Sequence, residues 1–170
     1  MEEEKDENQN EEDFEQDLDD VPNENEIAVN KRFWGHYTTK ITTQRGLILP
    51  EGCLKTLRAW KADSVLLWRE SYQTLSLFVL EMAEKIEAKY RSLVTEKLEK
   101  NIDPLKRAAI KKFFRILLSN RQLVAISVNG KITLSKDTLE LLDAKPGNYL
   151  HLIGLNERLL IMNDRLYEKH

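Results

Sequence analysis

The pattern of hydrophobic and polar positions between residues 40 and 68 recurs between residues 125 and 153, at a constant offset of 85 residues. Each copy contains β-branched apolar runs, a tight polar turn and a short stretch with helical spacing. A unit that recurs in a sequence is usually one structural module used twice. The pattern therefore predicts two strand–turn–strand–helix–strand units that bury their apolar faces against each other, and such a pseudo-dimer suits a repetitive partner such as duplex DNA. Equivalent positions are Ile41 and Ile126, Leu54 and Leu139, Leu57 and Leu142, Asp63 and Asn148, and Leu67 and Leu152.

The two copies predict the same order of elements. In the first copy we expect strands at 33–41, 47–49, 64–68 and 73–79, and a helix at 51–58. In the second copy we expect strands at 123–127, 131–134, 149–154 and 158–162, a helix at 136–142, and a last helical turn at 163–168.

A helical pair is predicted between the copies. Residues 80–99 carry apolar side chains at helical spacing, and Asp103-Pro104 is a strong start signal for a second helix. The second helix has Leu105, Ala109, Phe113, Ile116 and Leu117 on one face and several basic residues on its other surfaces. We expect an antiparallel hairpin that braces the two β units, with subunit contacts as a possible additional role.

Charge divides the chain into two parts. Residues 1–30 contain 14 acidic residues and one lysine, a net charge of −13, whereas the other 140 residues contain 25 basic and 15 acidic residues, a net charge of +10. A block of like charge with few aromatic residues cannot collapse, so we expect a disordered acidic tail. Two roles remain open: a solubilising tail, or a segment that lies over the basic body and competes with an anionic ligand.

These patterns predict four segments along the chain. They are a disordered acidic tail (1–30), a first β unit (31–79), a linking helical pair (80–118) and a second β unit (119–170).

The chemistry-bearing residues do not form a catalytic constellation, so we expect a protein that is not an enzyme and that holds no metal or cofactor. The three histidines, His36, His151 and His170, lack metal-ligand spacing, and Cys53 has no Cys or His neighbour. No phosphate-cradling glycine loop is present in the sequence. His151 lies in an apolar run, where an outward-facing strand residue or a hydrogen-bonded, half-buried histidine is expected rather than a ligand.

Hydropathy and cysteine content bear on the compartment. No apolar run approaches the roughly 20 residues that a membrane span needs, and the N-terminus is acidic rather than signal-like. The single cysteine, Cys53, excludes an intrachain disulfide and favours a reducing compartment. We therefore expect a cytoplasmic protein without membrane contact.

Two equivalent polar turns each carry a cation: Arg45 next to Gly46, and Lys131 next to Gly130. A turn between strands projects its side chains away from the sheet, and glycine lets the backbone approach a surface. The two tips are therefore candidates to contact a phosphate or a guanine edge of duplex DNA. The alternative is that the turns are basic only because they face water. Further salt-dependent phosphate contacts are expected from Lys31, Arg32, Lys40 and Arg121.

Several motifs between Phe33 and Lys169 resemble the MraZ family of bacterial proteins, which are built from two AbrB-like swapped-hairpin units. Phe33-Trp-Gly-His-Tyr resembles the family's Phe-x-Gly-x-Tyr opening, and Ile41–Pro50 falls on its Leu-Asp-x-x-Gly-Arg segment, which ends in proline. In the second copy Gly130-Lys-Ile falls on Gly-Arg-hydrophobic, and the run from Gly154 to Met162 resembles the closing Gly-x-x-x-Arg segment, with methionine in place of tryptophan. Residues 113–121 resemble the family's aromatic run before the second unit.

The resemblance implies a β-rich α+β fold of two AbrB-like β-barrel units, related by pseudo-two-fold symmetry and joined by a helical hairpin. It also implies a nucleoid-associated transcriptional regulator that assembles as a ring-like homo-oligomer. Such a regulator binds promoter-proximal DNA repeats of the division and cell-wall gene cluster through the arginines of its Asp-x-x-Gly-Arg turns.

This chain departs from the family at the turns. Thr42 and Ser127 replace both aspartates, and Arg45 and Gly46 stand in reversed order, which displaces the guanidinium by one position. Lys131 keeps the charge of the second turn but lacks the planar fork of arginine. Two functions therefore stay open: a DNA-binding regulator, or an oligomeric scaffold that keeps the fold and has lost specific DNA binding.

Overall fold

The computed structural model describes residues 27–100, 102–119 and 121–169, so the acidic segment up to residue 26 lies outside the described residues. The fold is mixed α+β, with five α-helices and antiparallel strand pairings in the described part of the chain. Two compact units can be distinguished. The helical unit contains residues 84–119, and the β unit combines Ile27–Ala83 with Asn120–His170.

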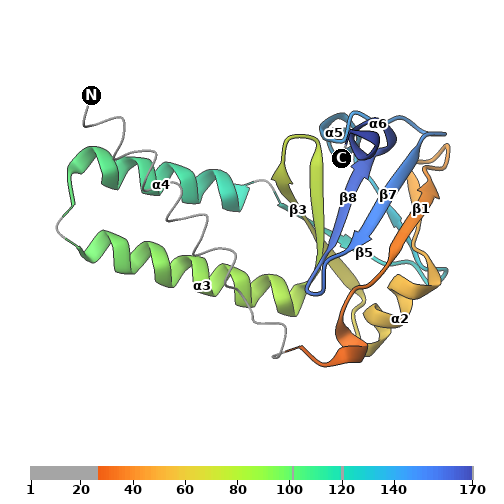
Figure 1. Ribbon diagram of the computed structural model, residues 1–170, viewed down its shortest axis with the longest axis horizontal. Coiled ribbons are helices and arrows are strands. Elements are labelled where there is room, and N and C mark those ends of the chain that lie inside the picture. Colours follow the sequence, from red (N-terminus) through yellow and green to blue (C-terminus); the bar gives the residue numbers. More distant parts are fainter. Residues whose placement is uncertain (1–26, 101, 120, 170) are drawn as a thin grey trace. The chain divides into compact units, whose positions relative to one another are not determined.

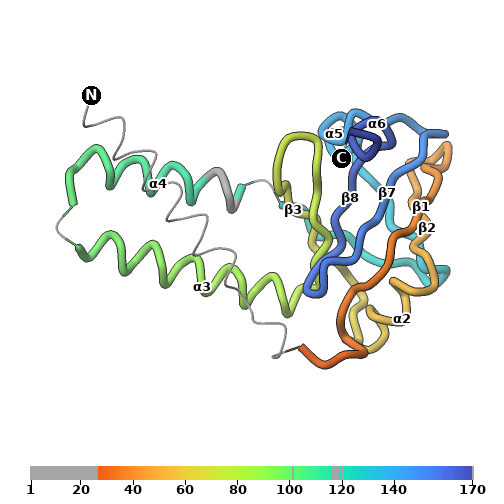
Figure 2. Tube along the Cα trace, viewed as in Figure 1, coloured from red at the N-terminus to blue at the C-terminus, as the bar shows by residue number. Residues whose placement is uncertain are grey.

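The β unit is built on an open six-stranded antiparallel sheet with the order β1-β7-β8-β4-β3-β5, and a separate pair is formed by β2 and β6 (Figure 1). Strands from the two ends of the sequence lie side by side in this sheet, as the neighbouring traces of β1 and β7 show (Figure 2). The strands are β1 (His36–Lys40), β2 (Gly46–Ile48), β3 (Ser64–Ser71), β4 (Thr74–Val79), β5 (Arg121–Ala125), β6 (Lys131–Thr133), β7 (Tyr149–Gly154) and β8 (Leu159–Asn163).

The offset of 85 residues predicted from the sequence recurs in the structure. The first residues of β1, β2, β3 and β4 precede those of β5, β6, β7 and β8 by 85 positions, and α2 (Glu51–Ala59) precedes α5 (Lys136–Leu141) by the same offset. The pairing pattern is unchanged when the copies are exchanged: Thr38 pairs with His151 between β1 and β7, and Leu123 pairs with Leu66 between β5 and β3. The internal repeat is therefore a repeat of structure.

The strands of the two copies are intermingled in one sheet. The first strand of each copy pairs with the third strand of the other copy, and the fourth strands, β4 and β8, pair with each other at the centre. The segments expected at 31–79 and 119–170 thus share a sheet instead of each building one.

Element boundaries follow local backbone chemistry. The strand expected at 33–41 is shorter in the structure, because Gly35 adopts a φ of +87° that interrupts the extended chain before β1. Phe33 instead forms an isolated bridge to Asn156. The last helical turn expected at 163–168 is present as α6 (Asp164–Glu168), and Asn163 caps it by accepting a hydrogen bond from the Leu166 amide at 2.7 Å.

The core lies where both faces of the sheet are covered. Every residue of the central strand β4 is buried, whereas the edge strand β1 alternates between exposed and half-buried positions. Cys53 is buried in α2, and burial raises the pKa of its thiol to about 12. This cysteine is therefore a packing residue and not a nucleophile at neutral pH.

The helical unit is formed by α3 (Leu80–Glu99), whose first turn still belongs to the β unit, and α4 (Pro104–Ser119). The start signal at Asp103 is confirmed, since its carboxylate accepts a hydrogen bond from the Leu105 amide at 3.2 Å. The two helices are joined by long side chains: the guanidinium of Arg91 lies 5.6 Å from the centre of the Phe114 ring. Leu105 is 68% exposed, so the apolar face expected on α4 is exposed to solvent in the first turn of the helix.

Candidate nucleic-acid interface

The two sequence-predicted turns are tight hairpin loops with the same backbone. Thr42 accepts a hydrogen bond from the Arg45 amide at 3.0 Å, and Ser127 accepts one from the Gly130 amide at 2.9 Å. The fourth residue of each turn is left-handed, with φ of 62° at Arg45 and 76° at Gly130. This is the three-residue hairpin loop in which a left-handed residue forms a bulge before the next strand.

The side-chain hydroxyl groups of Thr42 and Ser127 hold these loops closed. The Thr42 Oγ1 accepts a hydrogen bond from the Gly46 amide at 2.8 Å, and the Ser127 Oγ accepts one from the Lys131 amide at 3.1 Å. A hydroxyl can make this local bond as an aspartate does, but it brings no negative charge. The turns are therefore closed by groups that add no negative charge beside Arg45 and Lys131.

The two cations do not occupy equivalent positions. The offset pairs Arg45 with Gly130 and Gly46 with Lys131, so the displacement expected from the reversed Arg45-Gly46 order is confirmed. Arg45 adopts a backbone conformation that costs a non-glycine residue about 1–2 kcal/mol. Lys131 instead lies over Gly46, where an added Cβ would stand only 2.7 Å from the Lys131 Cδ. The missing side chain in one copy thus makes room for the cation of the other copy.

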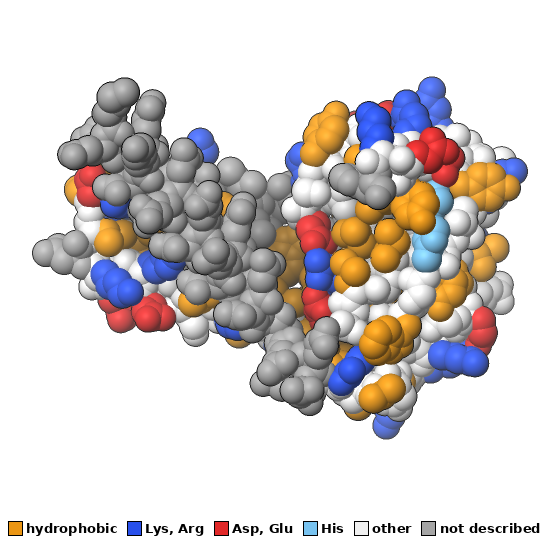
Figure 3. Space-filling model, viewed as in Figure 1, with side chains coloured by type: hydrophobic (Ala, Val, Ile, Leu, Met, Phe, Trp, Pro, Cys, Tyr) orange, Lys and Arg blue, Asp and Glu red, His pale blue; other side chains and the backbone are white. Residues whose placement is uncertain are grey.

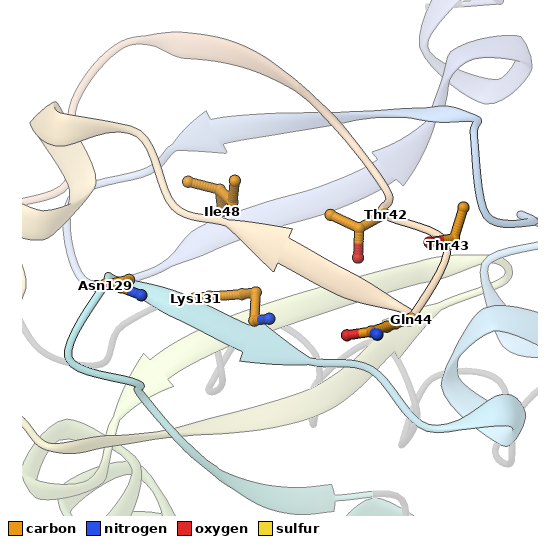
Figure 4. Close-up of a pocket in the computed structure, with 6 residues that line it drawn as sticks. All are labelled: Thr42, Thr43, Gln44, Ile48, Asn129 and Lys131. Carbon is orange, nitrogen blue, oxygen red and sulfur yellow. The ribbon is translucent and has the colours of Figure 1, made fainter.

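A hollow of about 320 Å³ lies on the face formed by the turns and the β2–β6 pair. Both copies contribute to it, and among the described residues no acidic side chain lines it (Figure 4). The close-up places Gln44 and Asn129 toward opposite ends of the β2–β6 pair, with Lys131 between them. The lining residues are Thr42, Thr43, Gln44, Ile48, Asn129 and Lys131.

Of the other cations predicted to contact phosphate, one lies beside a turn and the others lie farther away. Lys40 ends β1 next to the first turn, where its ammonium group is 6.0 Å from the centre of the Tyr149 ring. Arg121 begins β5, at the end of that strand remote from the second turn, and Arg32 lies before β1, where its Nε donates to the Ile27 carbonyl at 2.9 Å. The structure therefore brings Lys40 close to the turns and leaves Arg32 and Arg121 a strand length away, roughly 16 Å at 3.3 Å per residue. Lys31 lies over the Trp60 ring.

A histidine cluster was missed by sequence reasoning. The Nε2 of His36 lies 2.8 Å from the Nδ1 of His151, whose Nε2 lies 2.6 Å from an Asp164 oxygen. The Tyr167 ring stacks on His151, with 4.0 Å between ring centres. His151 is thus the hydrogen-bonded histidine of the two alternatives considered. Histidine atoms reach the surface between hydrophobic side chains (Figure 3). Because His36 and His151 are 115 residues apart, no local spacing could have revealed the pair.

An ion pair joins the β3–β4 and β7–β8 hairpins. Burial alone would raise the pKa of Glu70, but hydrogen bonds from Arg158 and Ser76 and the charge of Arg158 outweigh it, so this pKa lies below its usual value. Burial alone would lower the pKa of Arg158, but hydrogen bonds to Glu70 and Glu157 and the charges of these two carboxylates raise it. Arg158 donates to both Glu70 oxygens, at 3.0 and 2.5 Å. The pair locks hairpins from different copies together.

Two features are absent from the described part of the chain, a metal-binding cluster and a membrane-spanning helix. Within residues 27–100, 102–119 and 121–169, no cluster of His, Cys, Asp and Glu is arranged to bind a metal ion. No described helix combines the length and apolar character required to cross a bilayer.

No protein-family model matches the chain, and no curated protein matches it by sequence.

Proposed function

We propose that this chain is a duplex-DNA-binding transcriptional regulator of the MraZ type. The observation that carries the proposal is that two repeat-equivalent turns flank the β2–β6 pair, each with one cation, Arg45 or Lys131. Lys131 lines the hollow beside this pair, and the described residues that line the hollow include no acidic side chain. Phosphate contacts of such cations provide salt-dependent affinity, and contacts to base edges add specificity.

The finer architecture belongs to the same proposal. The exchange-symmetric pairing, in which β1 joins β7 and β5 joins β3, supports two interleaved AbrB-like swapped-hairpin units. A ring-like homo-oligomer of this kind would present many pairs of turns to promoter-proximal repeats, and it would gain affinity through avidity. Its place in the cell would then be the nucleoid.

A salt titration of binding to duplex DNA tests the proposal. The logarithm of the affinity should fall steeply with the logarithm of the salt concentration, and the slope should shrink by about 1 for each lost phosphate contact. We therefore expect Arg45→Ala and Lys131→Ala each to flatten the slope. Arg69→Ala is the matched control, because Arg69 lies at the end of β3 remote from the second turn.

A scaffold without DNA binding remains the second candidate. The specific observation in its favour is apolar exposure on the same face: Val128 at the tip of the second turn is fully exposed, and Ile48 beside the hollow is 55% exposed. A chain lacking residues 1–26 removes the acidic segment and keeps the buried Ile27. If this chain does not bind duplex DNA at low salt, the regulator is excluded and the scaffold is favoured. Tighter binding than the full chain would instead indicate a tail that covers the basic face.

A further inference from the structure

The carboxamides in the two turns are related by the internal repeat. Gln44 and Asn129 are 85 residues apart, each follows the exposed tip residue of its turn, and both line the hollow (Figure 4). Both residues are exposed. The repeat thus places two side chains of the same chemical class at equivalent positions on one face.

The polar groups of the turns divide into two classes. The hydroxyls of Thr42 and Ser127 are occupied, because each accepts a hydrogen bond from a backbone amide of its own turn. The carboxamides of Gln44 and Asn129 have no hydrogen-bond partner within residues 27–100, 102–119 and 121–169. They keep their full donor and acceptor capacity for a ligand, and their loss would not disturb the turns.

The chemistry of the face separates affinity from specificity. Lys131 is a compact point charge, which attracts any phosphate but does not discriminate between bases. A carboxamide carries a donor and an acceptor side by side, and this pair matches N7 and N6 of adenine in the major groove. The antiparallel pairing places Gly46 opposite Thr133 and Ile48 opposite Lys131, and Gln44 and Asn129 each lie two residues beyond one end of this pair. The two carboxamides are therefore separated by up to six residue steps along the pair, about 20 Å at 3.3 Å per residue. Base pairs are stacked 3.4 Å apart, so the carboxamides are spaced for positions up to about six base pairs apart.

We propose that Gln44 and Asn129 determine the sequence specificity of this face by each reading an adenine in the major groove of duplex DNA. This inference rests on the proposed DNA-binding function and adds the residues that choose the base. The two turns should select two A·T pairs up to about six base pairs apart, whereas Lys131 supplies affinity without sequence preference.

Selection from a random-sequence duplex pool by the full-length protein tests the inference. The wild-type protein should enrich two adenine positions at the stated spacing. Gln44→Ala and Asn129→Ala should each reduce the preference at one position, by roughly tenfold to a hundredfold, the worth of one good bidentate contact. Lys131→Ala is the contrasting variant, because it should weaken binding to all sequences about equally.

A change of specificity gives a readout that a structural role would not produce. A carboxylate accepts a hydrogen bond from the N4 amino group of cytosine, so Gln44→Glu should replace adenine by cytosine at one selected position and leave the other unchanged. An unchanged selected sequence in the Gln44→Ala/Asn129→Ala double variant would overturn the inference. So would binding that is steeply salt-dependent but enriches no sequence, although this result would leave the proposed function intact. Absence of any binding at low salt would overturn both.

Discussion

The two turns share a backbone and differ in where each carries its charge. In the first turn the cation occupies the left-handed position, where the second turn has Gly130. In the second turn the cation occupies the next position, where the first turn has Gly46. The comparison shows that the hydrogen bonds of the loop, and not the identity of the charged residue, set the common geometry.

A second comparison concerns the contacts that fix α3, which follows β4, and α6, which follows β8. In the second copy, α6 packs on β7 through polar contacts between His151, Asp164 and Tyr167. In the first copy the corresponding positions are Leu66 in β3, Val79 at the end of β4 and Met82 in the first turn of α3, and all three are buried. Both solutions cover the sheet, because a helix can be fixed to a strand either by apolar area or by a connected polar network.

Substitutions in the β2–β6 pair are expected to have the largest effect, and they test whether the two copies are structurally equivalent. Leu47 and Ile132 are equivalent positions, they pair across β2 and β6, and both are fully buried. We expect Leu47→Ala and Ile132→Ala each to lower the free energy of unfolding by about 2–5 kcal/mol, through lost burial and the cavity left behind. Chemical denaturation measures both.

Ile48→Ala is the matched control, because Ile48 is a neighbour that is 55% exposed and should change stability by less than about 0.5 kcal/mol. A large loss from only one of the two core substitutions would show that the copies do not share a core.

The ion pair between Arg158 and Glu70 joins hairpins from different copies, so its removal tests whether this contact stabilises the fold. Arg158→Ala leaves the half-buried Glu70 without its cation and should cost about 1–3 kcal/mol of unfolding free energy. Because the pKa of Glu70 is lowered in the folded state, the stabilisation is present above the unfolded pKa near 4.5 and is lost as the pH falls through the lower folded pKa. Glu70→Gln should therefore weaken the acid dependence of stability.

The exposed pair between Arg165 and Asp143 provides the control for this experiment. Arg165→Ala should cost less than about 1 kcal/mol, because both side chains are more than half exposed. Equal costs for Arg158→Ala and Arg165→Ala would argue against the lock between the hairpins.

The smallest expected effect comes from the left-handed position of the turns. Arg45→Gly should raise the free energy of unfolding by about 1 kcal/mol, because glycine adopts this conformation without steric cost. Gly130→Ala should lower it, since a Cβ there would lie 2.7 Å from the Leu54 Cδ1. Thermal unfolding of both variants measures the difference. A loss of stability in Arg45→Gly would mean that the arginine side chain makes a stabilising contact.

Much of the fold could be predicted because apolar spacing is a local signal. The helix expected at 51–58 is found at Glu51–Ala59, and the strand expected at 149–154 has those bounds in the structure. The intermingling of the two copies in one sheet could not be predicted, because strand order depends on pairings between distant residues.

The candidate site could be predicted only in part. The offset already contained the information that Arg45 is equivalent to Gly130, which is the signal for the left-handed turn position. The roles of Thr42 and Ser127 in closing the loops follow from the type of turn, which local residue types alone did not fix. The contact between His36 and His151 depends on the register of β1 against β7, which no sequence pattern specifies.

Because the sheet contains strands of both copies, the chain cannot be divided into two complete halves. Each half supplies an outer strand to the other: β1 completes the sheet beside β7, and β5 completes it beside β3. A half produced as a separate polypeptide would have a bare backbone edge, and it would satisfy that edge by recruiting a second half. The single chain thus has the architecture of a covalently tethered dimer, whose halves must fold in concert.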